Sequence, residues 1–231
     1  MLVMNWMCQP AITINADDVV ADAATLLQKH EIHMLPVMQK GKLVGIVTDR
    51  DIKRVSPSDV ISENRIQDSD FLAGIIIKEI MTPDPVTIPY DYSLAETVEK
   101  FLVHKISSLP VVNQQQKVIG VITKSDFFYL FLILTGFGKK GLQFAIEVED
   151  RPESLKTITD IMREYGGHIS SILSTRERAR KGYRRLYIRV FEIDQPSLQH
   201  LKEIISKKAN LLYIIDHNEK KREWFQRIQR Y

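Results

Sequence analysis

The sequence predicts an α+β protein: two strand–helix–strand–strand–helix repeats packed as a pseudo-symmetric pair, followed by a region with a βαββαβ, ferredoxin-like pattern. Three observations support this prediction. The first 137 residues contain an internal duplication, both copies show the same order of apolar patterns, and the rest of the chain alternates strand and helix signals in a different order. Apolar residues make up 44% of the 231-residue chain, which is ordinary for a protein with packed cores.

The duplication is visible as two aligned series of short motifs. The string MCQPAITI in the first copy corresponds to MTPDPVTI in the second, and HEIHMLPV corresponds to HKISSLPV. The offset is 74 residues from Met7 to Met81 and 75 from Gly45 to Gly120, because the second turn is one residue longer. Surface turns tolerate such insertions, so the two copies are expected to share one fold.

Each copy combines one helical pattern with two short β-branched runs. Val20, Ala24 and Leu27 follow helical spacing in the first copy, and residues 94–102 do so in the second. A unit of roughly 50 residues buries little apolar surface by itself, so we expect the copies to share a core. We place the two repeats at residues 1–56 and 79–138, with 57–78 as the connecting segment.

The third region follows the string GFGKKG. Leu142–Val148 alternates as a strand, Pro152 suits the first turn of a helix, and Gly166–Gly167 ends that helix. Two strands, a helix and a last strand follow, which gives a βαββαβ pattern over residues 141–215. Residues 216–231 remain as a basic tail, in which Trp224, Phe225 and Ile228 are expected to form one face of a helix.

Composition limits the class of protein. The single cysteine, Cys8, excludes an intramolecular disulfide and fits a reducing compartment. Met1–Pro10 lacks the features of a signal peptide. The most apolar run, Phe127–Leu134, is shorter than the ~20 residues that a membrane span needs. We therefore expect a cytoplasmic protein without membrane contact, in which this run forms a buried helix or an interface.

Positive charge is concentrated in two segments. Arg176–Arg189 holds seven basic residues and one acidic residue, and Glu219–Tyr231 holds five basic and two acidic residues. Nucleic-acid binding through Arg176–Arg189, which we call the basic hairpin, is therefore one hypothesis. A basic hairpin is more often simply solvated, so we do not expect nucleic acid to be the main partner.

After the β-branched runs, each repeat contains a Gly-x-x-Thr-x-x-Asp motif, GIVTDRD in the first and GVITKSD in the second. In one interpretation Thr48 and Thr123 cap the next helix, and Asp51 and Asp126 complete a box of reciprocal hydrogen bonds. In the other, the N-terminus of that helix receives a phosphate and the carboxylate holds the hydroxyls of a ribose. The two uses are compatible.

The duplicated MxxP–xxI, xLPV and GhhTxxD pattern resembles a pair of CBS domains, also called a Bateman module. The resemblance covers roughly residues 1–138 and implies adenosine-containing ligands such as AMP, ATP, NAD or S-adenosylmethionine in clefts between the repeats. It implies that each cleft combines the motif aspartate of one repeat with residues of the other. One cleft would then contain Asp126 with Thr123, Lys124, Cys8, Ala11, Ile32 and His33. The other would contain Asp51 with Thr48, Arg50, Thr82, Val86, Ile106 and Ser107.

The resemblance also implies roles for these residues. The aspartates would hold ribose hydroxyls and the threonines would lie by the ribose or first phosphate. Ala11 and Val86 would meet the adenine through their backbone, with the two isoleucines packing on it. His33 and Ser107 occupy the position that faces the phosphates in related pairs. The family often has a threonine where this chain has Cys8.

Residues 142–215 resemble an ACT domain, on the string EDRPESL. Glu153 and His168 stand where that family usually has the glycine and asparagine that approach a bound amino acid, so we expect a structural or dimerising domain. The domain order, with SPS after the first motif, resembles the acetoin-utilisation AcuB family.

The sequence thus predicts a non-enzymatic regulatory homodimer that senses an adenine nucleotide and acts on an unidentified protein target. The AcuB resemblance implies a link to acetoin utilisation. Two alternatives are a nucleic-acid-binding regulator and an enzyme of acetoin metabolism. No catalytic constellation, catalytic cofactor or metal site is expected, because the sequence has no GxSxG motif and no partner for Cys8 as a nucleophile. His30 and His33 have no further ligands at zinc-like spacing.

Overall fold

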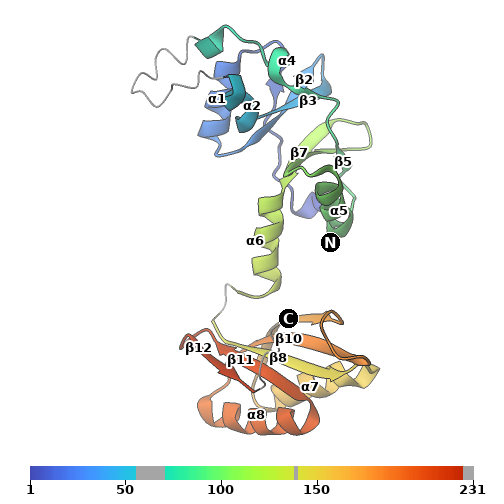
Figure 1. Ribbon diagram of the computed structural model, residues 1–231, viewed down its shortest axis with the longest axis vertical. Coiled ribbons are helices and arrows are strands. Elements are labelled where there is room, and N and C mark those ends of the chain that lie inside the picture. Colours follow the sequence, from blue (N-terminus) through green and yellow to red (C-terminus); the bar gives the residue numbers. More distant parts are fainter. Residues whose placement is uncertain (56–70, 138–139, 226–231) are drawn as a thin grey trace. The chain divides into compact units, whose positions relative to one another are not determined.

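The computed structural model describes residues 1–55, 71–137 and 140–225 (Figure 1). Two compact units are present, Met1–Phe127 and Phe128–Tyr231. Both units combine helices with sheets, so the expected α+β class is confirmed.

Both repeats in the first unit have the predicted order of elements. The first repeat consists of β1 (Ile14–Asn15), α1 (Val20–Lys29), β2 (Met34–Gln39), β3 (Lys42–Thr48) and α2 (Asp49–Val55). The second consists of β5 (Ile88–Pro89), α5 (Leu94–His104), β6 (Ser108–Val112), β7 (Val118–Thr123) and α6 (Lys124–Leu134). In each repeat the first strand pairs in parallel with the second, which pairs antiparallel with the third.

The two repeats exchange edge segments. The short strand β4 (Thr82–Pro83) starts the second repeat but pairs with β3 of the first, with Thr82 opposite Ile46. Conversely, Cys8 at the start of the first repeat bridges Val121 in β7 of the second. These two pairings are equivalent under the 74- and 75-residue offsets of the duplication. The sheets of the first unit therefore obey the internal pseudo-symmetry.

Close contact between the exchanged segments explains the glycine of each motif. A Cβ on Gly45 would lie 2.6 Å from Sδ of Met81 and 2.9 Å from the carbonyl oxygen of Thr82. A Cβ on Gly120 would lie 2.7 Å from Sδ of Met7 and 2.8 Å from the carbonyl oxygen of Cys8. Only a residue without a side chain fits at either position.

The end of the expected connecting segment packs into the first repeat. The helix α4 (Ile77–Ile80) follows a bridge between Val19 and Ile76, and Leu72 and Ile77 are buried in the core of that repeat. The equivalent bridge in the second repeat joins Leu2 to Ser93, just before η1 (Val3–Asn5). Residues 56–70 of the connecting segment, including the SPS string, lie outside the described residues.

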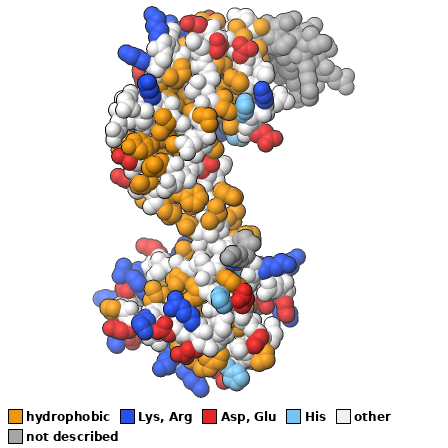
Figure 2. All heavy atoms as spheres, turned by 180° about the vertical axis from the view of Figure 1, so that it is seen from behind, with side chains coloured by type: hydrophobic (Ala, Val, Ile, Leu, Met, Phe, Trp, Pro, Cys, Tyr) orange, Lys and Arg blue, Asp and Glu red, His pale blue; other side chains and the backbone are white. Residues whose placement is uncertain are grey.

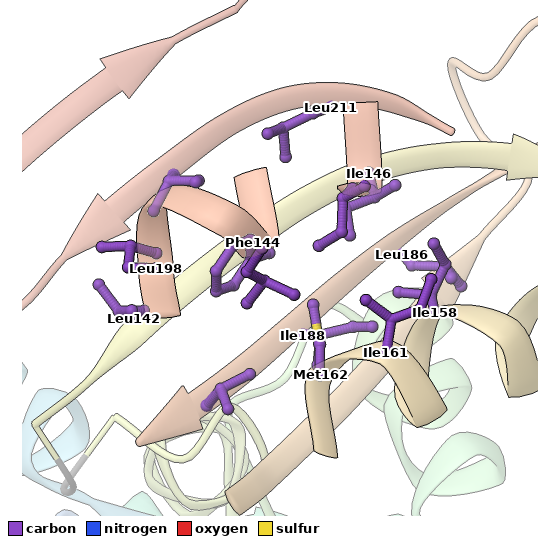
Figure 3. Packing of buried hydrophobic residues seen from close by; sticks show 14 of the residues in the cluster. Leu142, Phe144, Ile146, Ile158, Ile161, Met162, Leu186, Ile188, Leu198 and Leu211 are labelled. Atoms are coloured by element: carbon purple, nitrogen blue, oxygen red, sulfur yellow. The ribbon is translucent and has the colours of Figure 1, made fainter. Parts of the chain in front are cut away.

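The second unit has the predicted βαββαβ order. It contains β8 (Leu142–Glu149), α7 (Pro152–Glu164), β9 (His168–Thr175), β10 (Tyr183–Phe191), α8 (Gln195–Lys208) and β11 (Asn210–Asp216). With β12 (Lys221–Trp224), the strands form one antiparallel sheet in the order β12-β11-β8-β10-β9. Apolar side chains of β8 and β10 pack against those of α7 and α8 (Figure 3). The strands contribute Phe144, Ile146, Leu186 and Ile188, and the helices contribute Ile158, Met162 and Leu198.

The prediction of a helical face in the tail is wrong for its described part. Residues Lys221–Trp224 form the strand β12, which pairs with β11 and extends the sheet. A turn produces this hairpin, because Oδ1 of Asp216 accepts hydrogen bonds from the N–H groups of Asn218 and Glu219. Trp224 lies against Tyr213, with 4.9 Å between ring centroids, and Ile228 lies outside the described residues.

The apolar run Phe127–Leu134 is helical but not buried. Within α6 only Leu130 is buried, whereas Phe128, Tyr129 and Phe131 are each at least 60% exposed. Figure 2 shows apolar side chains gathered over this part of the chain. The buried-helix alternative is therefore wrong. Among the described residues, no helix combines the length and apolarity required to cross a membrane.

Candidate functional site

The two Thr–Asp pairs occupy the point where a strand passes directly into a helix. Thr48 ends β3 and α2 begins at the next residue. Oδ2 of Asp51 accepts hydrogen bonds from the backbone N–H of Thr48 at 2.9 Å and from its hydroxyl at 2.6 Å. The N–H of Asp51 lies 3.4 Å from the Thr48 hydroxyl oxygen. The pair is thus a capping box, as one of the two interpretations predicts.

The second motif repeats this geometry. Oδ2 of Asp126 accepts from the N–H of Thr123 at 2.7 Å and from its hydroxyl at 2.8 Å, and the N–H of Asp126 donates to that hydroxyl at 3.3 Å. In both pairs the threonine hydrogen-bonds to Oδ2, and these bonds leave Oδ1 of the aspartate for another donor. The capping role and a ligand-binding role can therefore coexist in the same side chain.

The surroundings of the two aspartates differ. Asp51 is buried, and its Oδ1 lies 3.6 Å from a guanidinium nitrogen of Arg54. Asp126 is half-buried, and the position equivalent to Arg54 is Tyr129. A cation therefore already stands beside the first aspartate, whereas the matched position beside the second is uncharged.

The exchanged edge segments bring residues of opposite repeats together. Cys8 lies close enough to Asp126 for the carboxylate, after the larger effect of burial, to raise the pKa of the thiol. Thr82 pairs with Ile46, two residues before Thr48 on the same strand. The structure thus joins Cys8 to the second motif and Thr82 to the first.

His33 and Ser107 lie beside the helix of their own repeat. The carbonyl oxygen of His33 accepts from the N–H of Asp49 at 3.3 Å, and that of Ser107 accepts from the N–H of Lys124 at 2.9 Å. Nδ1 of His33 is 3.6 Å from the Asp49 carboxylate, and its side chain is 85% exposed. In the described residues, no hydrogen bond or ion pair joins His33 to Asp126 or Ser107 to Asp51.

The remaining candidates are partly accessible. Ala11, Ile32, Val86 and Ile106 are half-buried, as is Lys124, whereas Arg50 is exposed. These exposures leave the residues available for contact with a ligand, but among the described residues they do not line a common cavity.

A hollow of about 800 Å³ lies at the other end of the strands, where each repeat turns from its second strand to its third. None of the thirteen predicted binding residues lines it. It is bounded by Lys40, Gly41, Lys42, Leu43, Asp84, Pro85, Thr87, Val112, Gln115, Gln116 and Lys117. Sequence analysis missed it, although the lysines at the equivalent positions 42 and 117 were a visible signal. The described residues include no group of three or more His, Cys, Asp or Glu side chains suited to a metal ion.

Comparison with known proteins identifies the family. A model of the CBS domain matches the chain twice, over residues 3–58 and 77–132. A CBS domain-containing protein of Dictyostelium discoideum is 33% identical over 132 residues, which are 57% of this chain and 91% of that protein. The chain belongs to the CBS-domain proteins.

Other similar proteins contain the CBS pair within different contexts. The inosine-5′-monophosphate dehydrogenase of Korarchaeum cryptofilum is 34% identical over 125 residues, or 54% of this chain, but the match spans only 23% of that enzyme. A solved CBS domain pair in complex with 5′-methylthioadenosine and S-adenosyl-L-methionine is 31% identical, with a TM-score of 0.48; the match covers 60% of this chain and 98% of that one.

Proposed function

We propose that this CBS protein is a non-enzymatic regulator that binds an adenine nucleotide in clefts between its two repeats. The observation that carries the proposal is the duplicated Thr–Asp pair. Both copies have the same hydrogen-bond geometry at a helix N-terminus, and each stands next to an edge segment contributed by the other repeat.

This arrangement suits a ribose phosphate. The threonine fixes one carboxylate oxygen, so the other can accept a hydrogen bond from a ribose hydroxyl without further ordering of the side chain. The positive end of the helix dipole at this N-terminus favours a phosphate. The adenine would then contact the half-buried Ala11 or Val86 segment, in keeping with the family resemblance.

The two clefts would differ in affinity. Arg54 already lies near the free oxygen of Asp51, so a ribose there must compete with or displace this contact. The matched position beside Asp126 is the uncharged Tyr129, and we propose that the positive charge of Lys124 attracts a phosphate. We expect the Asp126 cleft to bind more tightly.

We propose that the second unit is a structural or dimerising ACT domain. Its sheet order and βαββαβ connections support the ferredoxin-like part of this assignment. Glu153 lies in the first turn of α7, where it adds a charged side chain, and His168 pairs with Glu192 at 3.3 Å. Both features disfavour a free amino acid at this position. The link to acetoin utilisation rests on domain order and a short string.

The basic hairpin gives little support to nucleic-acid binding. Arg176 and Arg184 pair with Asp150 at 2.6 and 2.9 Å, and Arg180 pairs with Glu147 at 2.6 Å. Two carboxylates, Asp150 and Glu147, therefore offset two of the seven positive charges of Arg176–Arg189. A phosphate backbone would have to break these pairs.

Calorimetric titration with AMP, ADP, ATP and S-adenosylmethionine tests the proposed function. Asp51→Ala and Asp126→Ala should each abolish or weaken binding in one cleft by at least about tenfold, equivalent to ~1.4 kcal/mol. Each substitution also removes a helix cap, which costs about 1 kcal/mol of stability by itself.

Glu96→Ala is the matched control. Ser93 and Glu96 form a capping box of the same geometry at α5, with 2.6 Å between Oγ and Oε2, outside both clefts. This variant should lose similar stability but keep native nucleotide affinity. Absence of any heat of binding in the native protein, or equal losses in all three variants, would contradict the proposal.

A further inference from the structure

The chain that leaves α6 is fixed to the sheet of the second unit. The carbonyl oxygen of Thr135 accepts a hydrogen bond from the Ser171 hydroxyl at 3.0 Å. Gly136 follows with a φ of +65°, and a Cβ there would lie 2.5 Å from Oγ of Ser170. The backbone thus approaches β9 at a distance that only glycine permits.

The next side chain, Phe137, contacts two residues that can carry positive charge. Its ring lies edge-to-face with the imidazole of His217, with 5.9 Å between centroids. The guanidinium carbon of Arg189 is 5.7 Å from the centre of the same ring. Arg189 is 3% exposed and Phe137 is 56% exposed, so the ring partly covers the guanidinium.

Arg189 and His217 are also in direct contact. A terminal nitrogen of Arg189 lies 3.1 Å from Nε2 of His217 and 3.1 Å from the amide oxygen of Gln143. Arginine only donates hydrogen bonds, so the contact with His217 requires an unprotonated Nε2. Protonation of that nitrogen would place an N–H group of a cation against the guanidinium.

The other charged groups around His217 do not cancel the unfavourable effect of Arg189 on its protonation. Burial is the main factor that lowers its pKa, followed by the charges of Arg189 on β10 and Arg222 on β12, while Asp216 on β11 acts in the opposite direction. Gln143 on β8 is neutral. The surroundings therefore favour the imidazole that accepts the hydrogen bond.

We propose that Phe137, Arg189 and His217 form a pH-sensitive latch, which holds the end of α6 on the C-terminal sheet while His217 is neutral and releases it when His217 is protonated. The inference does not depend on nucleotide binding. Asp126 lies in the first turn of α6. In this proposal, pH controls the attachment at the other end of the same helix.

The sign of the effect follows from linkage. His217 binds its proton less readily in the folded protein than in the unfolded chain, so the stability of the latch falls as the pH drops below the ordinary histidine value of about 6.5. Above that value both states carry a neutral ring and the latch is closed.

Hydrogen exchange measured by mass spectrometry at pH 7.5 and 5.5, corrected for intrinsic rates, tests the latch. Protection of a peptide covering residues 131–137 should fall at least threefold at the lower pH. His217→Gln keeps an acceptor for Arg189 but cannot be protonated, so its protection should not change with pH. His168→Gln, which removes an exposed histidine of the same unit, should retain the native response.

The proposal would be overturned if protection of residues 131–137 in the native protein did not change with pH. It would also be overturned if the His217→Gln variant lost protection at low pH as the native protein does. If the variant fails to fold, NMR titration of the native protein decides. The His217 ring should titrate below 6.5 and the Phe137 ring resonances should shift with the same midpoint. A higher midpoint, or Phe137 resonances that do not follow it, would rule the latch out.

Discussion

Different residues of the duplicated motif have different structural roles. The threonine and aspartate close a capping box, and the glycine lets the edge segment of the other repeat approach the strand. The first task is readable from the sequence, because capping residues lie three positions apart. The second is not, because it depends on which distant segment becomes the neighbour of the strand.

The glycine of the second motif provides a prediction at this scale. Gly120→Ala should destabilise the protein by about 1–3 kcal/mol, because its Cβ would overlap a backbone carbonyl and not only a flexible side chain. Gly74→Ala is the control, since the nearest atom to its Cβ would be 3.5 Å away. Urea denaturation of both variants measures the difference. Equal urea midpoints for the two variants would show that the Met7–Cys8 segment can move away from the new Cβ without loss of stability.

Among elements, α6 departs most from its counterpart. Phe128 and Tyr129 occupy the positions equivalent to Lys53 and Arg54 on α2, and Leu102 and Val103 on α5 are equivalent to Gln28 and Lys29 on α1. The second repeat therefore exposes apolar side chains where the first has polar ones. Exposed apolar surface of this extent indicates an interface, and a second copy of the chain supplies a self-complementary one.

We predict a homodimer formed through α5 and α6 of the second repeat. Replacing Phe128 and Tyr129 by the residues of the first repeat, Phe128→Lys with Tyr129→Arg, should shift the protein to the monomer mass of 26.7 kDa. Light scattering over a range of concentrations measures this. Lys53→Ala on α2 should leave the dimer intact. A native protein that is monomeric at all concentrations would disprove the prediction.

Helices and strands were predicted correctly where the apolar pattern extended over many residues. The prediction failed in the C-terminal tail, where a turn leads into a strand. The helices of both units and the order of their strands follow from apolar spacing. The strand β12 was missed because aromatic residues at helical spacing near the C-terminus masked the turn at Asp216. The exposure of α6 was left open, since an apolar run has the same pattern in a core and in an interface.

At the scale of the first unit, the duplication predicted a shared core but not how it is shared. The exchange of β4 and the Cys8 segment means that neither sheet is complete without residues from the other repeat. Leu72 and Ile77, which precede the second repeat, are likewise buried in the core of the first. We therefore expect the two repeats to unfold in a single transition.

This reciprocity should make the protein separable into complementary fragments. A chain cut between residues 55 and 71 leaves each piece with an unpaired strand edge and with the peptide that covers the edge of the other. Mixed fragments should therefore reassemble as a one-to-one complex, detectable by size-exclusion chromatography and by recovery of native circular dichroism. An N-terminal fragment that starts at Pro10, and so lacks Cys8, should reassemble more weakly. If each fragment folded fully by itself and did not bind the other, the exchanged edge segments would not be needed for folding. If the fragments reassemble, the protein can serve as a split reporter whose two halves recognise each other through their own fold.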